Sequence, residues 1–164
     1  VGFGEPWSIA IGRFDGDGLP DVATGGSVRQ RGPLAGFSTF LGCASCKQLA
    51  TPERTPCGLV GPSDDVNVAP RTDTTYFQLA TLELNDDGFD DVVVLHRELH
   101  TVSVFLSGGD GRFAKGPEFV LPWGTTGDLA SAYEVKGNQR TAVAVTTIPS
   151  ANRFVFMRFR PKPR

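Results

Sequence analysis

Hydrophobic positions along the chain alternate with polar ones or form short continuous blocks, and both patterns end at Gly, Pro, Asn or Asp. A period of two is typical of half-buried β-strands, whereas an amphipathic helix repeats its apolar positions every three to four residues. About ten such segments occur, with turn residues between them. They are residues 7–14, 21–26, 37–42, 76–84, 91–96, 101–107, 118–122, 129–135, 141–148 and 153–159. The pattern predicts an all-β sandwich, barrel or propeller.

Self-similarity favours the propeller among these architectures. Three segments have the order strand, polar loop, strand: IAIGRFDGDGLPDVATGG, LATLELNDDGFDDVVVLH and, more weakly, ASAYEVKGNQRTAVAVTT. A further strand that ends in a hairpin follows each of them, and Gly109, Asp110 and Gly111 supply the left-handed positions for one such hairpin. We therefore expect about three four-stranded antiparallel sheets, each a propeller blade, at about residues 5–42, 76–122 and 128–160.

The stretch between the first two repeats, residues 43–75, is rich in Pro, Gly, Ser and Asp and has no sustained periodicity. It is predicted to be a long inserted loop within a single segment that spans residues 1–164.

The polar loop of the second repeat has the composition of a cation site. Oxygen-bearing side chains stand at its positions 1, 3, 5 and 9, and a backbone carbonyl is available at position 7. These residues are Glu83, Asn85, Asp87, Asp91 and Phe89. Ca²⁺ takes six to eight oxygen ligands and tolerates irregular geometry, so it fits better than Mg²⁺. The loop differs from an EF-hand because strands flank it and position 12 is Val94.

The segments GRFDGDGLPDVA, LELNDDGFDDVV and VSVFLSGGDGRF resemble the FG-GAP or VCBS-type repeats of integrin alpha-subunit propellers and of many secreted bacterial proteins. The resemblance covers most of residues 5–160 apart from the insert. It implies that each repeat is one blade, that seven blades commonly close a ring, and that the acidic loops bind Ca²⁺.

The resemblance extends unevenly to the other two repeats. In the first, Asp15, Asp17 and Asp21 match the ligand positions, as does the carbonyl of Leu19, but Arg13 replaces the first acidic ligand. We expect its guanidinium to pair with these aspartates and reduce cation binding. In the third repeat, Lys136, Gly137 and Asn138 replace the motif and the loop is predicted to be shortened, so no metal is expected there. The alternative for both acidic loops is an ordinary turn, in which Asp, Asn and Gly are also common.

All three cysteines, Cys43, Cys46 and Cys57, lie in the predicted insert. Zinc would need a fourth ligand that the neighbourhood lacks, and Lys47 stands where haem attachment requires His. We expect a disulfide between Cys57 and either Cys43 or Cys46, which favours an extracellular or periplasmic compartment.

Other candidate sites are less specific. His96 and His100 would face one side of a helix and bind zinc, but strands on both sides predict a turn instead. The chain has no G-x-S-x-G motif and no phosphate-binding loop. Trp7, Trp123 and Tyr133 are candidates for a rim that contacts a glycan or a peptide.

Composition and charge narrow the classes further. Sixteen basic and 18 acidic residues give a net charge of −2, which provides no basic field for nucleic acid. The longest apolar runs, such as DVVVL, are too short for a membrane-spanning helix. The chain starts at Val1 without an initiator Met, and we expect a processed or excised piece.

The sequence therefore predicts a non-catalytic, calcium-binding propeller module that is secreted, extracellular or periplasmic and serves protein interaction, adhesion or assembly. The alternatives are an accessory propeller part of a secreted enzyme and a carbohydrate-binding propeller. Because a stack of blades leaves its end faces bare, we expect other chains, or the remainder of a larger seven-bladed or oligomer-completed propeller, to cover them.

Overall fold

The computed structural model describes residues 6–27, 34–42, 59–70, 77–125, 127–136 and 139–159. Within these ranges the strands form three antiparallel sheets, and no helix is long and apolar enough to cross a membrane. The first sheet contains β1 (Pro6–Gly12), β2 (Asp21–Ser27), β3 (Leu34–Gly42) and β4 (Leu59–Pro70); the second β5 (Phe77–Leu82), β6 (Asp91–His96), β7 (Thr101–Ser107) and β8 (Phe113–Val120); the third β9 (Ala130–Lys136), β10 (Gln139–Ile148) and β11 (Arg153–Phe159). The predicted all-β class, with about three antiparallel sheets, is confirmed.

Every strand pairs with the strand before or after it in the sequence, so each sheet is a simple meander. Short turns favour this order because antiparallel neighbours need only a few connecting residues. In the β7–β8 hairpin, Gly109 and Gly111 both have a φ of +77°. Glycine adopts this left-handed backbone without the steric cost of a Cβ atom, as predicted for these two positions, whereas Asp110 between them was also expected to be left-handed and has no positive φ.

The strand β4 lies within the predicted insert of residues 43–75, and this corrects the expectation of a continuous loop there. It pairs along β3 as the edge strand of the first sheet, with two irregularities in register. Its sequence, LVGPSDDVNVAP, contains the Pro, Gly and Asp that mark loops. An edge strand tolerates them because one side of its backbone needs no partner.

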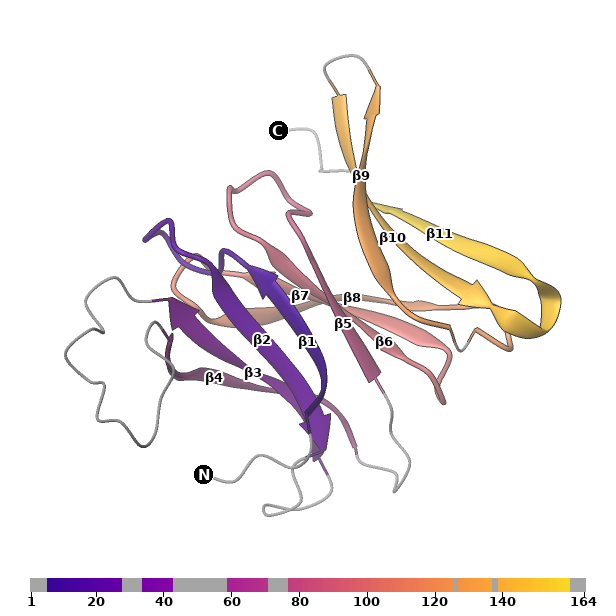
Figure 1. Ribbon diagram of the computed structural model, residues 1–164, viewed down its shortest axis with the longest axis horizontal. Coiled ribbons are helices and arrows are strands. Elements are labelled where there is room, and N and C mark those ends of the chain that lie inside the picture. Colours follow the sequence, from indigo (N-terminus) through magenta and orange to yellow (C-terminus); the bar gives the residue numbers. More distant parts are fainter. Residues whose placement is uncertain are drawn as a thin grey trace.

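The middle sheet lies between the other two (Figure 1), and its strands β6 and β7 are buried on both faces, whereas its edge strand β8 is largely exposed. Alternate residues of β6 point to opposite sides. Val92 and Val94 pack in a core shared with the first sheet, and Val93 and Leu95 pack in a core shared with the third. Burial on both faces explains why DVVVL is a continuous apolar run rather than an alternating one.

The first strands of the three sheets lie side by side, with β5 between β1 and β9 (Figure 1). The Thr81 hydroxyl donates to the carbonyl of Ile11 at 2.6 Å, and the Leu79 N–H donates to Ser8 Oγ at 2.9 Å. On the other side, the Glu83 N–H donates to the Tyr133 hydroxyl at 2.8 Å. This order brings the loops that follow β1 and β5 to the same end of the molecule.

Candidate calcium-binding loops

The two acidic loops have the same length and the same frame. Gly12 pairs with Asp21, which encloses residues 13–20, and Leu82 pairs with Asp91, which encloses residues 83–90. In the third sheet Lys136 pairs directly with Gln139, so only residues 137–138 connect the strands, and these two lie outside the described residues. The shortened third loop predicted from the sequence agrees with this pairing.

The aspartate that directly follows each loop, at the first position of the next strand, is buried. It links the loop to the end of the third strand of the same sheet. Asp91 accepts the N–H of Leu84 at 3.0 Å and that of Ser107 at 2.9 Å. The equivalent Asp21 accepts the N–H of Phe14 at 2.5 Å and that of Gly42 at 2.7 Å. These carboxylates satisfy backbone donors that are otherwise cut off from water.

Burial raises the pKa of Asp91 to about 7, and the negative charges of Asp87 and Glu83 add to the rise. Two backbone N–H groups oppose it without cancelling it. The fold thus brings three of the predicted ligand positions close enough for their charges to repel one another.

The remaining predicted ligands of the second loop turn toward the backbone of the same loop. Glu83 Oε1 accepts the N–H of Asn85 at 3.0 Å and that of Asp86 at 2.7 Å. Asp87 Oδ1 accepts the N–H of Phe89 at 2.9 Å, and the Asn85 amide donates to Asp87 Oδ2 at 2.8 Å. In the part of the chain that the structure describes, no three acidic, histidine or cysteine side chains are arranged as a metal site. Carboxylate and amide oxygens are suitable ligands for a hard cation. In this structure, however, they accept N–H groups of their own loop, as Asp, Asn and Glu side chains do in turns.

The first loop repeats this pattern with fewer donors. Asp15 Oδ1 accepts the N–H of Asp17 at 2.9 Å, and Asp17 Oδ1 accepts the N–H of Leu19 at 2.7 Å. Desolvation on burial raises the pKa of Asp15, and the charges of Asp21 and Asp17 contribute in the same direction.

Arg13 was expected to pair with the aspartates of its own loop, but the described ion pair joins it to Asp90 of the second loop. Arg13 Nε lies 4.0 Å from Asp90 Oδ2. The Arg13 N–H also donates to the Asp90 side chain, at Oδ2, at 2.9 Å, and the two backbones meet where the Asp90 N–H donates to the Arg13 carbonyl at 2.8 Å. The two acidic loops are therefore joined directly, which sequence reasoning missed because Asp90 stands outside the ligand spacing.

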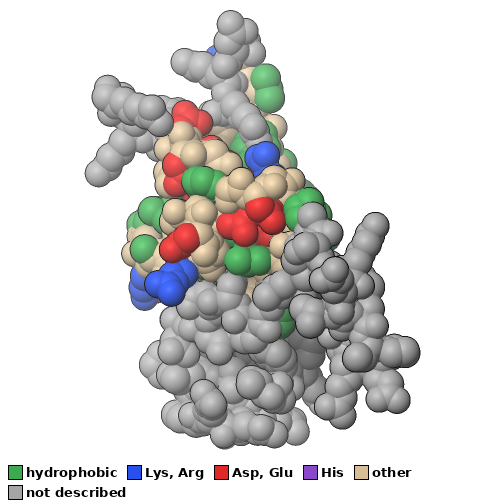
Figure 2. Space-filling model, turned by 90° about the vertical axis from the view of Figure 1, so that its left-hand side faces the viewer, with side chains coloured by type: hydrophobic (Ala, Val, Ile, Leu, Met, Phe, Trp, Pro, Cys, Tyr) green, Lys and Arg blue, Asp and Glu red, His purple; other side chains and the backbone are tan. Residues whose placement is uncertain are grey.

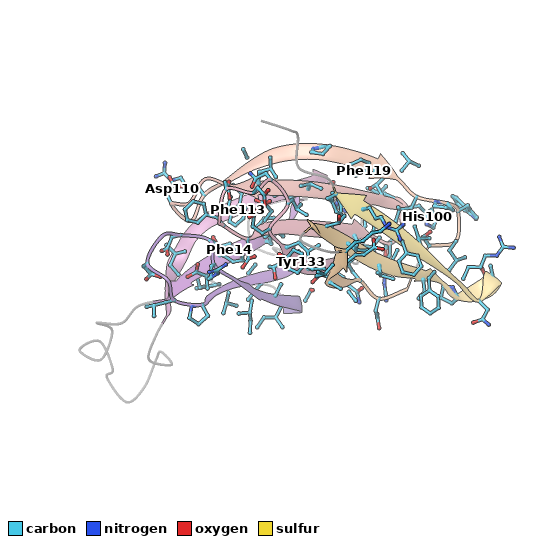
Figure 3. The ribbon with its side chains drawn as sticks, turned by 90° about the horizontal axis from the view of Figure 1, so that it is seen from above. Phe14, His100, Asp110, Phe113, Phe119 and Tyr133 are labelled. Carbon is cyan, nitrogen blue, oxygen red and sulfur yellow. The ribbon has the colours of Figure 1, made fainter. Side chains whose placement is uncertain are left out.

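The β7–β8 hairpin also packs against the first loop. Asp15 and Asp110 form a β-bridge, and the Gly111 N–H and the Ser107 hydroxyl both donate to the Phe14 carbonyl, at 3.0 and 2.9 Å. Figure 3 shows Phe14, Phe113 and Asp110 together at this end of the sheets. Acidic side chains gather on the described part of the same end in Figure 2.

The residues singled out beyond the loops have varied surroundings. His96 ends β6, buried, and His100 closes the turn of residues 97–100 before β7, so the two histidines lie on strand and turn rather than on a helix. Tyr133 packs against the core between the second and third sheets, and its hydroxyl accepts a hydrogen bond from the Glu83 N–H. This corrects its assignment to a rim. Trp123 is exposed. The side chain of Trp7 lies outside the described residues, as do Cys43, Cys46 and Cys57, so the disulfide stays a prediction.

Comparisons with models of known protein families, with curated proteins and with solved structures found no match to this chain. The class of protein is therefore defined by the chain's own sheets and loops: a row of antiparallel four- and three-stranded sheets, two of which have an acidic loop after their first strand.

Proposed function

We propose that the chain is a calcium-stabilised, non-catalytic module of propeller type that serves protein interaction or assembly in an extracellular or periplasmic compartment. The observation that carries the proposal is the repetition of one unit. Two sheets each place an acidic loop of equal length between their first and second strands, and those first strands lie side by side. Repeated units whose apolar faces stack on one another are typical of propellers and solenoids.

Calcium is proposed at the second loop, held by Glu83, Asn85, Asp87 and Asp91 with the carbonyl of Phe89. Bound Ca²⁺ supplies two positive charges to a site where carboxylates otherwise repel one another. The raised pKa of Asp91 supports this assignment, because burial and the charges of Asp87 and Glu83 leave its negative charge undercompensated.

The first loop is proposed as a second calcium site, formed by Asp15, Asp17, Asp21 and the carbonyl of Leu19. Since Arg13 is paired with Asp90, its guanidinium is directed toward the neighbouring loop. It nevertheless occupies the position of one acidic ligand, so this site has fewer oxygen donors and we expect it to bind calcium more weakly.

A binding role, rather than catalysis, is supported by how a serine, a histidine and a carboxylate are arranged in the described part of the chain. Ser103 Oγ donates to Glu118 Oε2 at 2.9 Å and lies 3.4 Å from His96 Nε2. In a serine nucleophile the histidine stands between the hydroxyl and the acid, so that it can take the hydroxyl proton. Here the serine stands in the middle and is buried, which favours a structural contact.

Interaction with further protein is proposed from the two outer faces of the row. On β1, Ile9 and Ile11 alternate with the core residue Ala10 and are about two thirds exposed, at 66% and 65%. On β11, Phe154 and Phe156 are likewise exposed. They lie on the face of the third sheet that points away from the core shared with the second sheet. Exposed apolar strand faces are typical of surfaces that another sheet covers.

Thermal unfolding with and without calcium tests the proposal. In about 5 mM calcium chloride the melting temperature should exceed its value in EDTA by roughly 5–10 °C, because ligand at 100 times its Kd adds about 2.7 kcal/mol. Asp87→Asn should remove most of this shift. The control Asp86→Asn removes the same charge from a position outside the ligand spacing and should retain it. Equal melting temperatures in calcium and EDTA would show that the loops are plain turns.

A further inference from the structure

A large aromatic side chain lies in the solvent at the end of the sheets opposite the acidic loops. Trp123 is 86% exposed, although Trp is among the side chains that gain most from burial. Leu99, within the β6–β7 turn, and Val120, the last residue of β8, are also exposed, and Val120 pairs with Thr101 directly after this turn. Figure 3 shows His100, the partner of Trp123, at the opposite end from Asp110. Apolar surface of this kind marks binding sites more often than scattered exposure does.

The indole is held on a rigid turn. The Leu121 N–H donates to the His100 carbonyl at 2.7 Å, and Thr125 returns to the Pro122 carbonyl through both its N–H, at 3.2 Å, and its hydroxyl, at 2.6 Å. His100 Nδ1 lies 3.3 Å from the Thr125 carbonyl. The backbone on both sides of Trp123 is therefore fixed before any ligand arrives, which lowers the entropic cost of binding.

His100 supports the indole from the protein side. The two ring centroids are 4.4 Å apart and the planes are inclined by 55°. His100 has a φ of +50°, a left-handed conformation that is uncommon for non-glycine residues but more frequent for His than for most. This turn conformation places the imidazole against the indole while most of the indole stays in water.

The size and polarity of the site decide what it fits. Trp123 offers about 150–250 Å² of contact, and even with Leu99 and Val120 added the surface stays well below the roughly 800 Å² that a stable protein interface needs from each partner. Among the described residues of this turn, the cation Arg97 is already paired with Asp128 at 2.9 Å, which disfavours an anionic ligand. Polar groups are present at the edge, since Ser150 Oγ would lie 3.5 Å from a Cβ on Gly124.

We propose that Trp123, backed by His100, is a stacking platform for a pyranose ring of an oligosaccharide. The C–H face of a sugar matches an indole in area and polarity, and its hydroxyls can bond polar groups at the edge. The inference deepens the proposed binding function by naming a ligand class, and it does not depend on calcium.

Tryptophan fluorescence tests the platform directly, because the chain has only two tryptophans, Trp7 and Trp123. In a Trp7→Phe background the emission reports on Trp123 alone. We expect at least one of three soluble hexasaccharides, of β-1,4-linked glucose, N-acetylglucosamine or mannose, to shift this emission saturably. Calorimetry on the wild-type chain should show the same sugar binding at least tenfold more weakly to Trp123→Ala, and a few-fold more weakly to His100→Ala.

Trp123→Ala removes an exposed side chain and should leave the circular dichroism spectrum and melting temperature unchanged. Sugar binding that persists in this variant would overturn the proposal, as would the absence of saturable binding with all three sugars at about 10 mM. Emission that changes with protein concentration alone would also overturn it and mark a protein interface instead. Repeating the titration in EDTA separates the two claims, because sugar binding should survive calcium removal whether or not the loops bind calcium.

Discussion

Single carboxylates have two distinct roles in this chain. Asp21 and Asp91 are buried acceptors that connect each acidic loop to the end of a neighbouring strand, whereas Asp17 and Asp87 lie at the surface within their loops. The sequence spacing marks all four alike as oxygen donors. Only the fold separates them, because burial depends on the strands that surround each side chain.

Asp91→Ala should lower the free energy of unfolding in EDTA by about 2 kcal/mol or more, because two buried N–H groups lose their acceptor. Asp17→Ala removes one exposed contact and should cost less than about 1 kcal/mol. Urea denaturation at pH 5 measures both, because at that pH the folded state does not carry the destabilising charge of Asp91. Similar losses in the two variants would show that the buried carboxylate has no special structural role.

His96 predicts a pH dependence of stability. Burial lowers its pKa below the ordinary value of 6.5, with Lys115 assisting and Glu118 opposing. As the pH falls below 6.5 the unfolded chain takes up the proton first, so stability is lost progressively toward the lower folded pKa. Asp91 acts in the opposite sense, since its raised pKa of about 7 means that stability is lost as the pH rises from about 4 toward 7.

The difference between the wild-type chain and His96→Leu isolates the histidine. Urea denaturation from pH 8 to pH 5 should show a steeper loss of stability with acidification in the wild-type chain than in the variant. Parallel pH profiles would contradict a buried neutral His96.

At the scale of elements, the hydrophobic pattern predicts strands best where packing is two-sided. The run DVVVL becomes β6, which is buried throughout. The pattern fails at edges: β8 begins at Phe113, ahead of the predicted start at residue 118, because Lys115, Gly116 and Pro117 interrupt the apolar signal. Edge strands need fewer apolar side chains and fewer backbone partners, so their sequences resemble loops.

The β7–β8 hairpin gives a prediction at this scale. A Cβ on Gly109 would overlap the ring of Phe89, whereas one on Gly18 would meet nothing within 4 Å, and both glycines have positive φ, +77° and +79°. Both substitutions carry a similar backbone cost, so Gly109→Ala should destabilise the fold by at least about 1 kcal/mol more than Gly18→Ala, and the difference isolates the cost of the overlap with Phe89. Equal melting temperatures of the two variants would contradict the packing of the hairpin on the second loop.

At the scale of the molecule, the repetition in the sequence predicts the number of sheets and the places of the acidic loops. The contacts between the first two sheets were not predictable from the sequence. They join Arg13 to Asp90 and Asp15 to Asp110, pairs that are far apart along the chain. A contact of this kind follows from how whole sheets stack. No local spacing in the sequence encodes it.

We expect the isolated chain to self-associate through the exposed apolar faces at the two ends of the row of sheets. Light scattering at about 100 µM should show species larger than a monomer, because Ile9 and Ile11 expose apolar surface. Replacing both with Lys should reduce the association without lowering the melting temperature, while Ala114→Lys at an exposed site of β8 should leave it unchanged. A monodisperse wild-type monomer would show that these faces need no partner.

The most direct test of the account is a crystal structure of the chain grown with calcium. We predict a cation in the second loop with oxygens of Glu83, Asn85, Asp87 and Asp91 and the carbonyl of Phe89 at about 2.3–2.6 Å. Glu83 and Asp87 would then have turned from the backbone N–H groups of their loop. A calcium-soaked structure in which both side chains keep those N–H contacts, with no cation between them, would contradict the central claim.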